Sequence, residues 1–122
     1  MSDKPVAERL QVKKDRRLTV LGASPELDRA IGAADARGEL SQAEVVLLAT
    51  PDRAAFEAAL PMILSDAPAG AILWVTYPKL SSGLASDLSR DVIRGLAPRF
   101  GLDTVSQIAI DADWSALRLK RI

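Results

Sequence analysis

The chain of 122 residues contains neither cysteine nor histidine. Without cysteine it forms no disulfide bond and has no thiolate nucleophile or cysteine-ligated metal. Without histidine it lacks the commonest general base and transition-metal ligand, so a Ser-His-Asp triad is excluded. Any chemistry therefore depends on Asp, Glu, Lys, Ser, Thr or Tyr side chains, or on backbone amides.

Long apolar runs are also missing. No segment approaches the roughly 20 apolar residues that a membrane helix needs, and the first residues, Met1–Pro5, lack the apolar centre of a secretory signal. We therefore expect a cytoplasmic protein without a membrane partner. Because 48% of the residues are hydrophobic and the formal net charge is zero, residues 1–122 are expected to form one ordered α/β domain.

Charge is uneven along the chain. The first eighteen residues hold six basic and three acidic side chains, whereas residues 19–69 hold three basic and eight acidic ones. Residues 1–16 are interpreted as a solvated basic arm with a short helix. The alternative is a nucleic-acid patch, formed by Lys13, Lys14, Arg16 and Arg17. Since no aromatic residue lies between these cations, stacking on bases is unsupported and nucleic acid is disfavoured as a partner.

Three apolar segments separated by helical patterns predict parallel strands, because such long crossovers return the chain in the same direction. They are residues 17–22, 44–49 and 71–77. We expect Trp74 to be buried in the third. Residues 104–110 and 115–120 alternate between polar and apolar, and their short link predicts an antiparallel hairpin.

The handedness of crossovers constrains the strand order. Right-handed crossovers through the first three strands would put every helix on one face of the sheet, whereas 44–49 is apolar on both faces. A short edge strand at 37–40, beside the first strand, resolves this conflict. The predicted fold is a mainly parallel sheet flanked by helices, with a C-terminal antiparallel hairpin whose last strand inserts beside the third.

Helix starts are predicted from capping residues. Ser24 with Pro25 gives an N-cap followed by proline at the first helical position, and Thr50 with Pro51 repeats this pattern. Ser86 is expected to cap a later helix. Pro61 is expected to kink or split the helix that contains it.

The strand, helix, strand, helix and hairpin order resembles the second half of the Rossmann-like methyltransferase fold, with 44–49 and 70–77 similar to its fourth and fifth strands. The whole chain also resembles a family of small bacterial proteins described only as a domain of unknown function. The matching segments are Ala7–Leu10, Val20–Gly22, Val45–Leu48, Leu73–Lys79 and Asp113–Arg118. The resemblances imply a shortened Rossmann-like scaffold and no particular activity.

A methyltransferase needs a glycine-rich loop after its first strand so that the cofactor can approach the backbone. Here the segment Leu21–Glu26 has only Gly22 and also contains Pro25. Glu26 would repel a phosphate at the start of the helix. We therefore expect S-adenosylmethionine to bind weakly or not at all, and no cofactor is predicted.

The loop after the third strand is the candidate ligand site, because open α/β sheets bind ligands where their parallel strands end. Lysine supplies charge, hydroxyl groups donate hydrogen bonds, and glycine allows close approach. The candidate residues are Tyr77, Lys79, Ser81, Ser82, Gly83 and Ser86. The alternative is a polar loop in which Ser86 only caps a helix. A Ser82 nucleophile with Lys79 as base is conceivable, but nothing in the sequence predicts the burial such a base needs.

Asp111 and Asp113 are spaced as in some oxygen-ligand metal sites. No third acid lies nearby in the sequence, and hairpin turns favour Asp for local hydrogen bonds. We therefore expect a structural turn and no metal.

Three functions remain open. The favoured one is a non-catalytic binding or interaction module on a truncated methyltransferase-like scaffold. The second is a domain that binds an anionic small molecule, or an enzyme acting on one, through the Lys79–Ser86 loop. The third is a nucleic-acid-associated protein that uses the basic arm. A homodimer is compatible with each of them.

Overall fold

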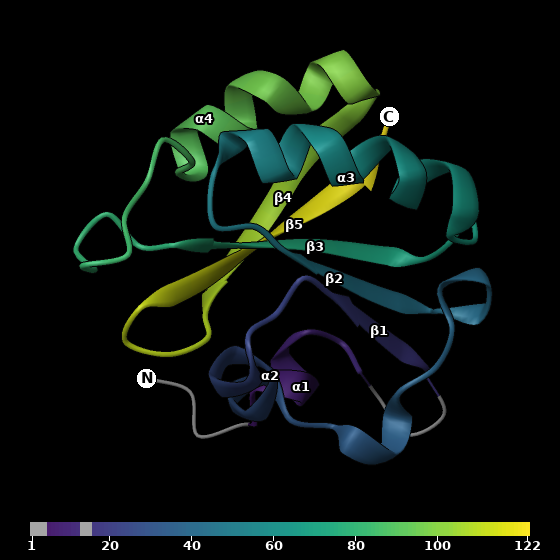
Figure 1. The fold of residues 1–122 in the computed structure, drawn as a ribbon. Coiled ribbons are helices and arrows are strands. Elements are labelled where there is room, and N and C mark those ends of the chain that lie inside the picture. Colours follow the sequence, from purple (N-terminus) through teal and green to yellow (C-terminus); the bar gives the residue numbers. More distant parts are fainter. Residues whose placement is uncertain (1–4, 13–15) are drawn as a thin grey trace.

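The computed structural model describes residues 5–12 and 16–122 and contains a five-stranded sheet with the order β1-β2-β3-β5-β4 (Figure 1). Lys13 and Lys14 of the predicted nucleic-acid patch lie outside the described residues. The strands are β1 (Leu18–Leu21), β2 (Val45–Ala49), β3 (Ile72–Pro78), β4 (Leu102–Ala109) and β5 (Trp114–Arg121).

The pairing of these strands corrects the predicted fold class. β1, β2 and β3 are parallel, whereas β5 pairs antiparallel with both β3 and β4. The prediction of a mainly parallel, Rossmann-like sheet is therefore wrong, because the sheet is mixed and its C-terminal part is antiparallel. The antiparallel part of the sheet is large because the two hairpin strands have eight residues each, whereas the parallel strand β1 has only four.

The hairpin itself is confirmed. β5 lies between β3 and β4, as the order predicted for the last strand required. The predicted edge strand at 37–40 is reduced to one isolated parallel bridge between Leu18 and Arg37. Arg37 is held there by its side chain, which donates to Asp28 Oδ1 at 2.7 Å and to the Gly32 carbonyl at 2.8 Å. The chain then turns into a short 3₁₀ helix, Leu40–Gln42, so no strand forms.

Helices cover both faces of the sheet (Figure 1). One face carries α3 (Arg53–Asp66) and α4 (Arg90–Leu96), and the other carries α1 (Val6–Arg9) and α2 (Pro25–Ile31). Three short 3₁₀ helices complete the fold: η1 (Ala34–Ala36), η2 (Leu40–Gln42) and η3 (Ala97–Phe100).

One of the three predicted helix caps is confirmed. The Ser24 Oγ accepts a hydrogen bond from the Leu27 amide, and Pro25 is the first residue of α2. Thr50 does not cap α3, because its buried hydroxyl donates to the Thr76 carbonyl instead. The cap of α3 is Asp52.

The cap of α4 is also displaced from its predicted position. Ser89 caps this helix by accepting from the Val92 amide, whereas the Ser86 Oγ accepts from the Leu88 amide in the preceding turn. Pro61 lies within α3, which continues from Arg53 to Asp66 and is not split.

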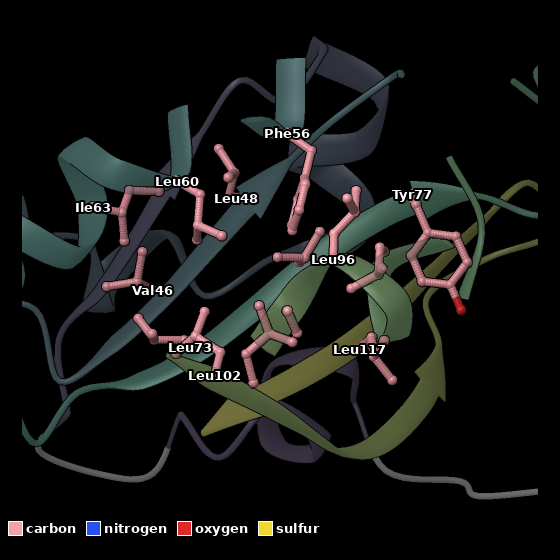
Figure 2. Close-up of a cluster of buried hydrophobic side chains, with 14 of the residues drawn as sticks. Val46, Leu48, Phe56, Leu60, Ile63, Leu73, Tyr77, Leu96, Leu102 and Leu117 are labelled. Atoms are coloured by element: carbon pink, nitrogen blue, oxygen red, sulfur yellow. The ribbon is translucent and has the colours of Figure 1, made fainter. Parts of the chain in front are cut away.

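Each face of the sheet has its own apolar cluster. Figure 2 shows the larger one, in which Phe56, Leu60 and Ile63 of α3 lie over Val46 and Leu48 of β2. The opposite cluster joins the first two helices to the sheet and includes Leu10, Leu27, Ile31, Leu47 and Trp74. The predicted burial of Trp74 is confirmed: it is 2% exposed, and its Nε1 donates to the Leu10 carbonyl at 2.9 Å.

Gly22 forms the turn between β1 and α2. Its φ is +80°, and a Cβ atom built there would lie 2.6 Å from the Ala49 carbonyl oxygen. Both the backbone conformation and the close approach of β2 therefore require glycine here. Packing against β2 accounts for this residue without a cofactor.

Candidate functional site

A groove of about 620 Å³ opens where β3 ends and the chain leads into α4. This volume falls in the range of small-molecule sites. Its lining comes from the end of β3, the following loop, the start of α4 and the hairpin strands. The lining residues are Tyr77, Lys79, Leu80, Ser81, Ser89, Arg90, Asp91, Gln107, Ile108, Ala109 and Ser115.

Half of the predicted site residues line this groove. Tyr77, Lys79 and Ser81 do, whereas Ser82, Gly83 and Ser86 are absent from the lining. The glycine marks no close approach, because an added Cβ at Gly83 would have no neighbour within 4 Å.

Hydrogen bonds of Ser82 and Lys79 give the loop after β3 a structural role. Ser82 donates from its Oγ to Asp113 Oδ1 at 2.8 Å, and the same Oγ accepts from the Leu84 amide at 3.0 Å. The Lys79 amide donates to the Asp113 carbonyl at 2.8 Å. These bonds tie the loop to the hairpin turn, and they give the Ser82 hydroxyl a carboxylate partner rather than the amine that the nucleophile hypothesis required.

The sequence reasoning missed five polar lining residues: Ser89, Arg90, Asp91, Gln107 and Ser115. Starting α4 at Ser86 placed Ser89, Arg90 and Asp91 further inside the helix than the cap and first turn where they lie. Gln107 and Ser115 come from the hairpin, whose contact with the loop depends on the insertion of β5. The insertion of β5 beside β3 was predicted, but the register that sets Ser115 directly opposite Tyr77 is seen only in the structure.

Tyr77 joins the apolar core to the groove. Its side chain is 3% exposed, and Figure 2 shows its hydroxyl pointing away from the surrounding apolar side chains. Burial raises the pKa of Tyr77, while the positive charge of Arg90 and the nearby Ser115 hydroxyl act in the opposite direction. The Ser115 contact does not meet hydrogen-bond geometry, so the Tyr77 hydroxyl has no partner among the described residues.

An unpartnered buried hydroxyl is costly, so a ligand atom that accepts its hydrogen bond would be favoured. Because the pKa of Tyr77 is raised, the phenol stays neutral near pH 7 and acts as a donor. The arrangement therefore favours a ligand with an acceptor atom, such as a carboxylate or phosphate oxygen.

Two cations and one acid line the groove. Arg90 lies 3.6 Å from Asp91 Oδ1 and 3.5 Å from Gln107 Oε1. Both partners of this ion pair are largely exposed, so it contributes little stability. Within the described part of the chain, Lys79 has no carboxylate at ion-pair distance. The lining thus carries a small positive excess that suits a singly charged ligand.

The two hairpin aspartates form the structural turn that was predicted. Asp111 Oδ1 accepts from the amides of Asp113 and Trp114, both at 2.8 Å. Asp113 in turn accepts from Ser82. Over residues 5–12 and 16–122, no three His, Cys, Asp or Glu residues cluster as a metal would require.

The described part of the predicted nucleic-acid patch is folded onto the protein. The Nη1 of Arg16 donates to the Gln11 carbonyl, and the Nη1 of Arg17 donates to the Asp35 carbonyl, both at 3.0 Å. These two guanidinium groups therefore already hold structural contacts.

A comparison with protein-family models and with curated proteins gives no match. The resemblance to the small bacterial family stays a prediction. Across the described ranges, no helix has the length and apolar character needed to cross a membrane.

Proposed function

We propose that this protein is a non-catalytic binding module that holds a small anionic molecule in the groove beside Tyr77. The observation that carries the proposal is the buried, unpartnered Tyr77 hydroxyl beside a groove of about 620 Å³. The side chains of Lys79 and Arg90 contribute two positive charges to the lining of this groove. A cytoplasmic location is part of the proposal.

The proposed ligand carries one carboxylate or phosphate group and an apolar portion. The neutral Tyr77 phenol donates to the anionic group, and Lys79 and Arg90 supply positive charge. Leu80 is 72% exposed at the groove and offers contact area to the apolar portion. Ser81 and Ser89 add hydroxyl donors.

Binding is favoured over catalysis for chemical reasons. The chain has no histidine or cysteine, and a raised pKa at Tyr77 disfavours the phenolate that a general base requires. The Ser82 hydroxyl is engaged with Asp113 and lies outside the groove lining.

The test is a thermal-shift screen of monocarboxylates, dicarboxylates and nucleotides, followed by calorimetry on each hit. Lys79→Ala should weaken binding of a true ligand about tenfold, because a charge-assisted hydrogen bond is lost. Tyr77→Phe should also weaken it while leaving the fold intact.

Arg29→Ala is the matched charge control, because Arg29 lies on α2, is 72% exposed and does not line the groove. This variant should bind each hit like the original protein. A ligand whose affinity is unchanged in both Lys79→Ala and Tyr77→Phe would refute the proposed site.

A further inference from the structure

The opposite end of the sheet carries a second concave region, at the edge where β1, β2 and β3 begin and β5 ends (right side of Figure 1). Two hollows of about 270 and 250 Å³ lie side by side there and share Gly70, Ala71 and Ile72 in their linings. We refer to these two hollows and their lining as the amino edge. None of its residues belongs to the groove beside Tyr77.

The amino edge is strongly basic. Its lining holds Arg16, Arg118, Lys120 and Arg121, against the single carboxylate of Glu44. Asp103 lies opposite Lys120 in the β4–β5 register but is not part of the lining. The remaining excess of positive charge exceeds what one carboxylate ligand would neutralise.

Strand geometry spreads the cations of β5 over both faces of the sheet. Side chains alternate along a strand, so Arg118 and Lys120 follow Ala116 onto the face of α1 and α2. Arg121 follows Leu119 onto the α3 face, where its Nη2 donates to the Leu64 carbonyl at 3.0 Å. The end of β5 therefore presents positive charge from two sides.

Arg118 has an unused donor. Its Nε is buried and has no hydrogen-bond partner, and the same is true of the Nε atoms of Arg9, Arg37 and Arg121. The latter three arginines each place a terminal nitrogen on a carbonyl or carboxylate oxygen. Within the described residues, the guanidinium of Arg118 makes no such bond, so it retains the donor pair that binds an oxyanion in bidentate fashion.

We propose that the amino edge binds a ligand carrying two or more phosphate groups. Arg118 and Lys120 lie on one face of the sheet and supply the donors for phosphate oxygens. Arg16 and Arg121 already donate to carbonyl oxygens, so they contribute positive charge. The backbone does not contribute the Ala71 and Ile72 amides, because these donate to the Pro68 and Glu44 carbonyls. Side chains therefore carry the recognition. This proposal is independent of the one for the groove.

Such phosphates come either from a small molecule or from a nucleic-acid backbone. The lining contains no aromatic side chain on which a base could stack. Recognition of a nucleic acid would thus be independent of sequence and would weaken steeply as salt concentration rises.

The experiment uses two probes, inorganic pyrophosphate in calorimetry and a short single-stranded oligonucleotide in fluorescence anisotropy. The test variant is the double substitution Arg118→Gln with Lys120→Gln, which should weaken binding of the recognised probe at least about tenfold. If that probe is the oligonucleotide, the slope of log K against log salt should also fall by about 0.7 for each cation removed.

One control accompanies the double variant. Arg29→Gln removes one exposed charge from α2, outside both the groove and the amino edge, so it should bind the probe like the original protein. Lys120→Gln alone changes an exposed side chain. This single variant replaces the double variant if the latter fails to fold. Its affinity for the probe should fall about threefold, because one peripheral charge is removed.

The outcomes separate clearly. Pyrophosphate binding that is sensitive to the double variant supports the proposal and identifies a small phosphate ligand. Oligonucleotide binding with the same sensitivity supports it and identifies a nucleic-acid backbone. The proposal is overturned if neither probe binds at low ionic strength, or if folded variants bind as tightly as the original protein.

Discussion

The two ends of the sheet differ in shape and in charge. The groove beside Tyr77 has more than twice the volume of either hollow at the amino edge, yet its lining pairs two cations with Asp91. The hollows of the amino edge are smaller, and their lining sets four cations against Glu44. Volume and positive charge are therefore separated between these two regions: the larger hollow has two cations and one acid in its lining, and the smaller ones together have four cations and one acid.

The cause of this separation lies in which residues flank the strands. The ends of β3 and of the hairpin turn bring Asp111 and Asp113 toward the Lys79 loop, and Asp113 is bonded to that loop. At the other end, β5 terminates in the basic run Arg118–Arg121. The comparison predicts that a substitution at one end of the sheet changes ligand binding at that end alone, provided the sheet between them stays intact.

The largest expected effect concerns the sheet that joins the two ends. Trp74→Ala should lower the free energy of unfolding by about 3–5 kcal/mol, because it leaves a cavity between β3 and the first two helices. It also removes the donor to the Leu10 carbonyl. Chemical denaturation measures the loss. An unchanged denaturation midpoint would mean that Trp74 does not belong to the core.

A smaller effect is expected at the start of α2, which follows the carboxyl end of β1, at the same end of the parallel strands as the groove. Gly22→Ala should lower the free energy of unfolding by about 1–3 kcal/mol, because an alanine at φ +80° is strained and its Cβ would meet the Ala49 carbonyl. The matched control is Gly83→Ala, where an added Cβ meets nothing. Equal denaturation midpoints for the two variants would contradict the turn geometry.

The smallest expected effect is the pH dependence that Tyr77 confers. Since its pKa is raised in the folded protein, the unfolded state loses this proton first, and stability should fall as pH rises above about 10. Tyr77→Phe should remove that part of the decline and leave stability near pH 7 within about 1 kcal/mol of the original. Denaturation series at neutral and alkaline pH measure both. Identical alkaline slopes would show that the phenol is not buried.

The parts of the fold that could be predicted from sequence have short-range causes. The hairpin followed from the short link through Asp111 and Asp113, and the α2 cap followed from Ser24 and Pro25. The prediction of a mainly parallel sheet was wrong because tertiary pairing sets the lengths of the strands. The predicted edge strand, for example, did not form, because the Arg37 side chain donates hydrogen bonds to Asp28 and to the Gly32 carbonyl.

The candidate site was half predictable for a similar reason. Tyr77, Lys79 and Ser81 are consecutive or nearly so at the end of β3, so a local argument found them. Ser115 and Gln107 reach the groove only through the register of β5 with its neighbours. The amino edge was missed entirely, because Gly70–Ile72 and Arg118–Arg121 are far apart in sequence and meet only when β3 and β5 pair.

Amide chemical shifts measured by NMR during a pyrophosphate titration test the central claim most directly, since they report both ends of the sheet at once. The separation of charge from concavity predicts that the largest shifts occur at Gly70–Ile72 and Arg118–Arg121, with Ser81, Ser89 and Arg90 nearly unchanged. Largest shifts at the groove residues, with the amino edge silent, would contradict it.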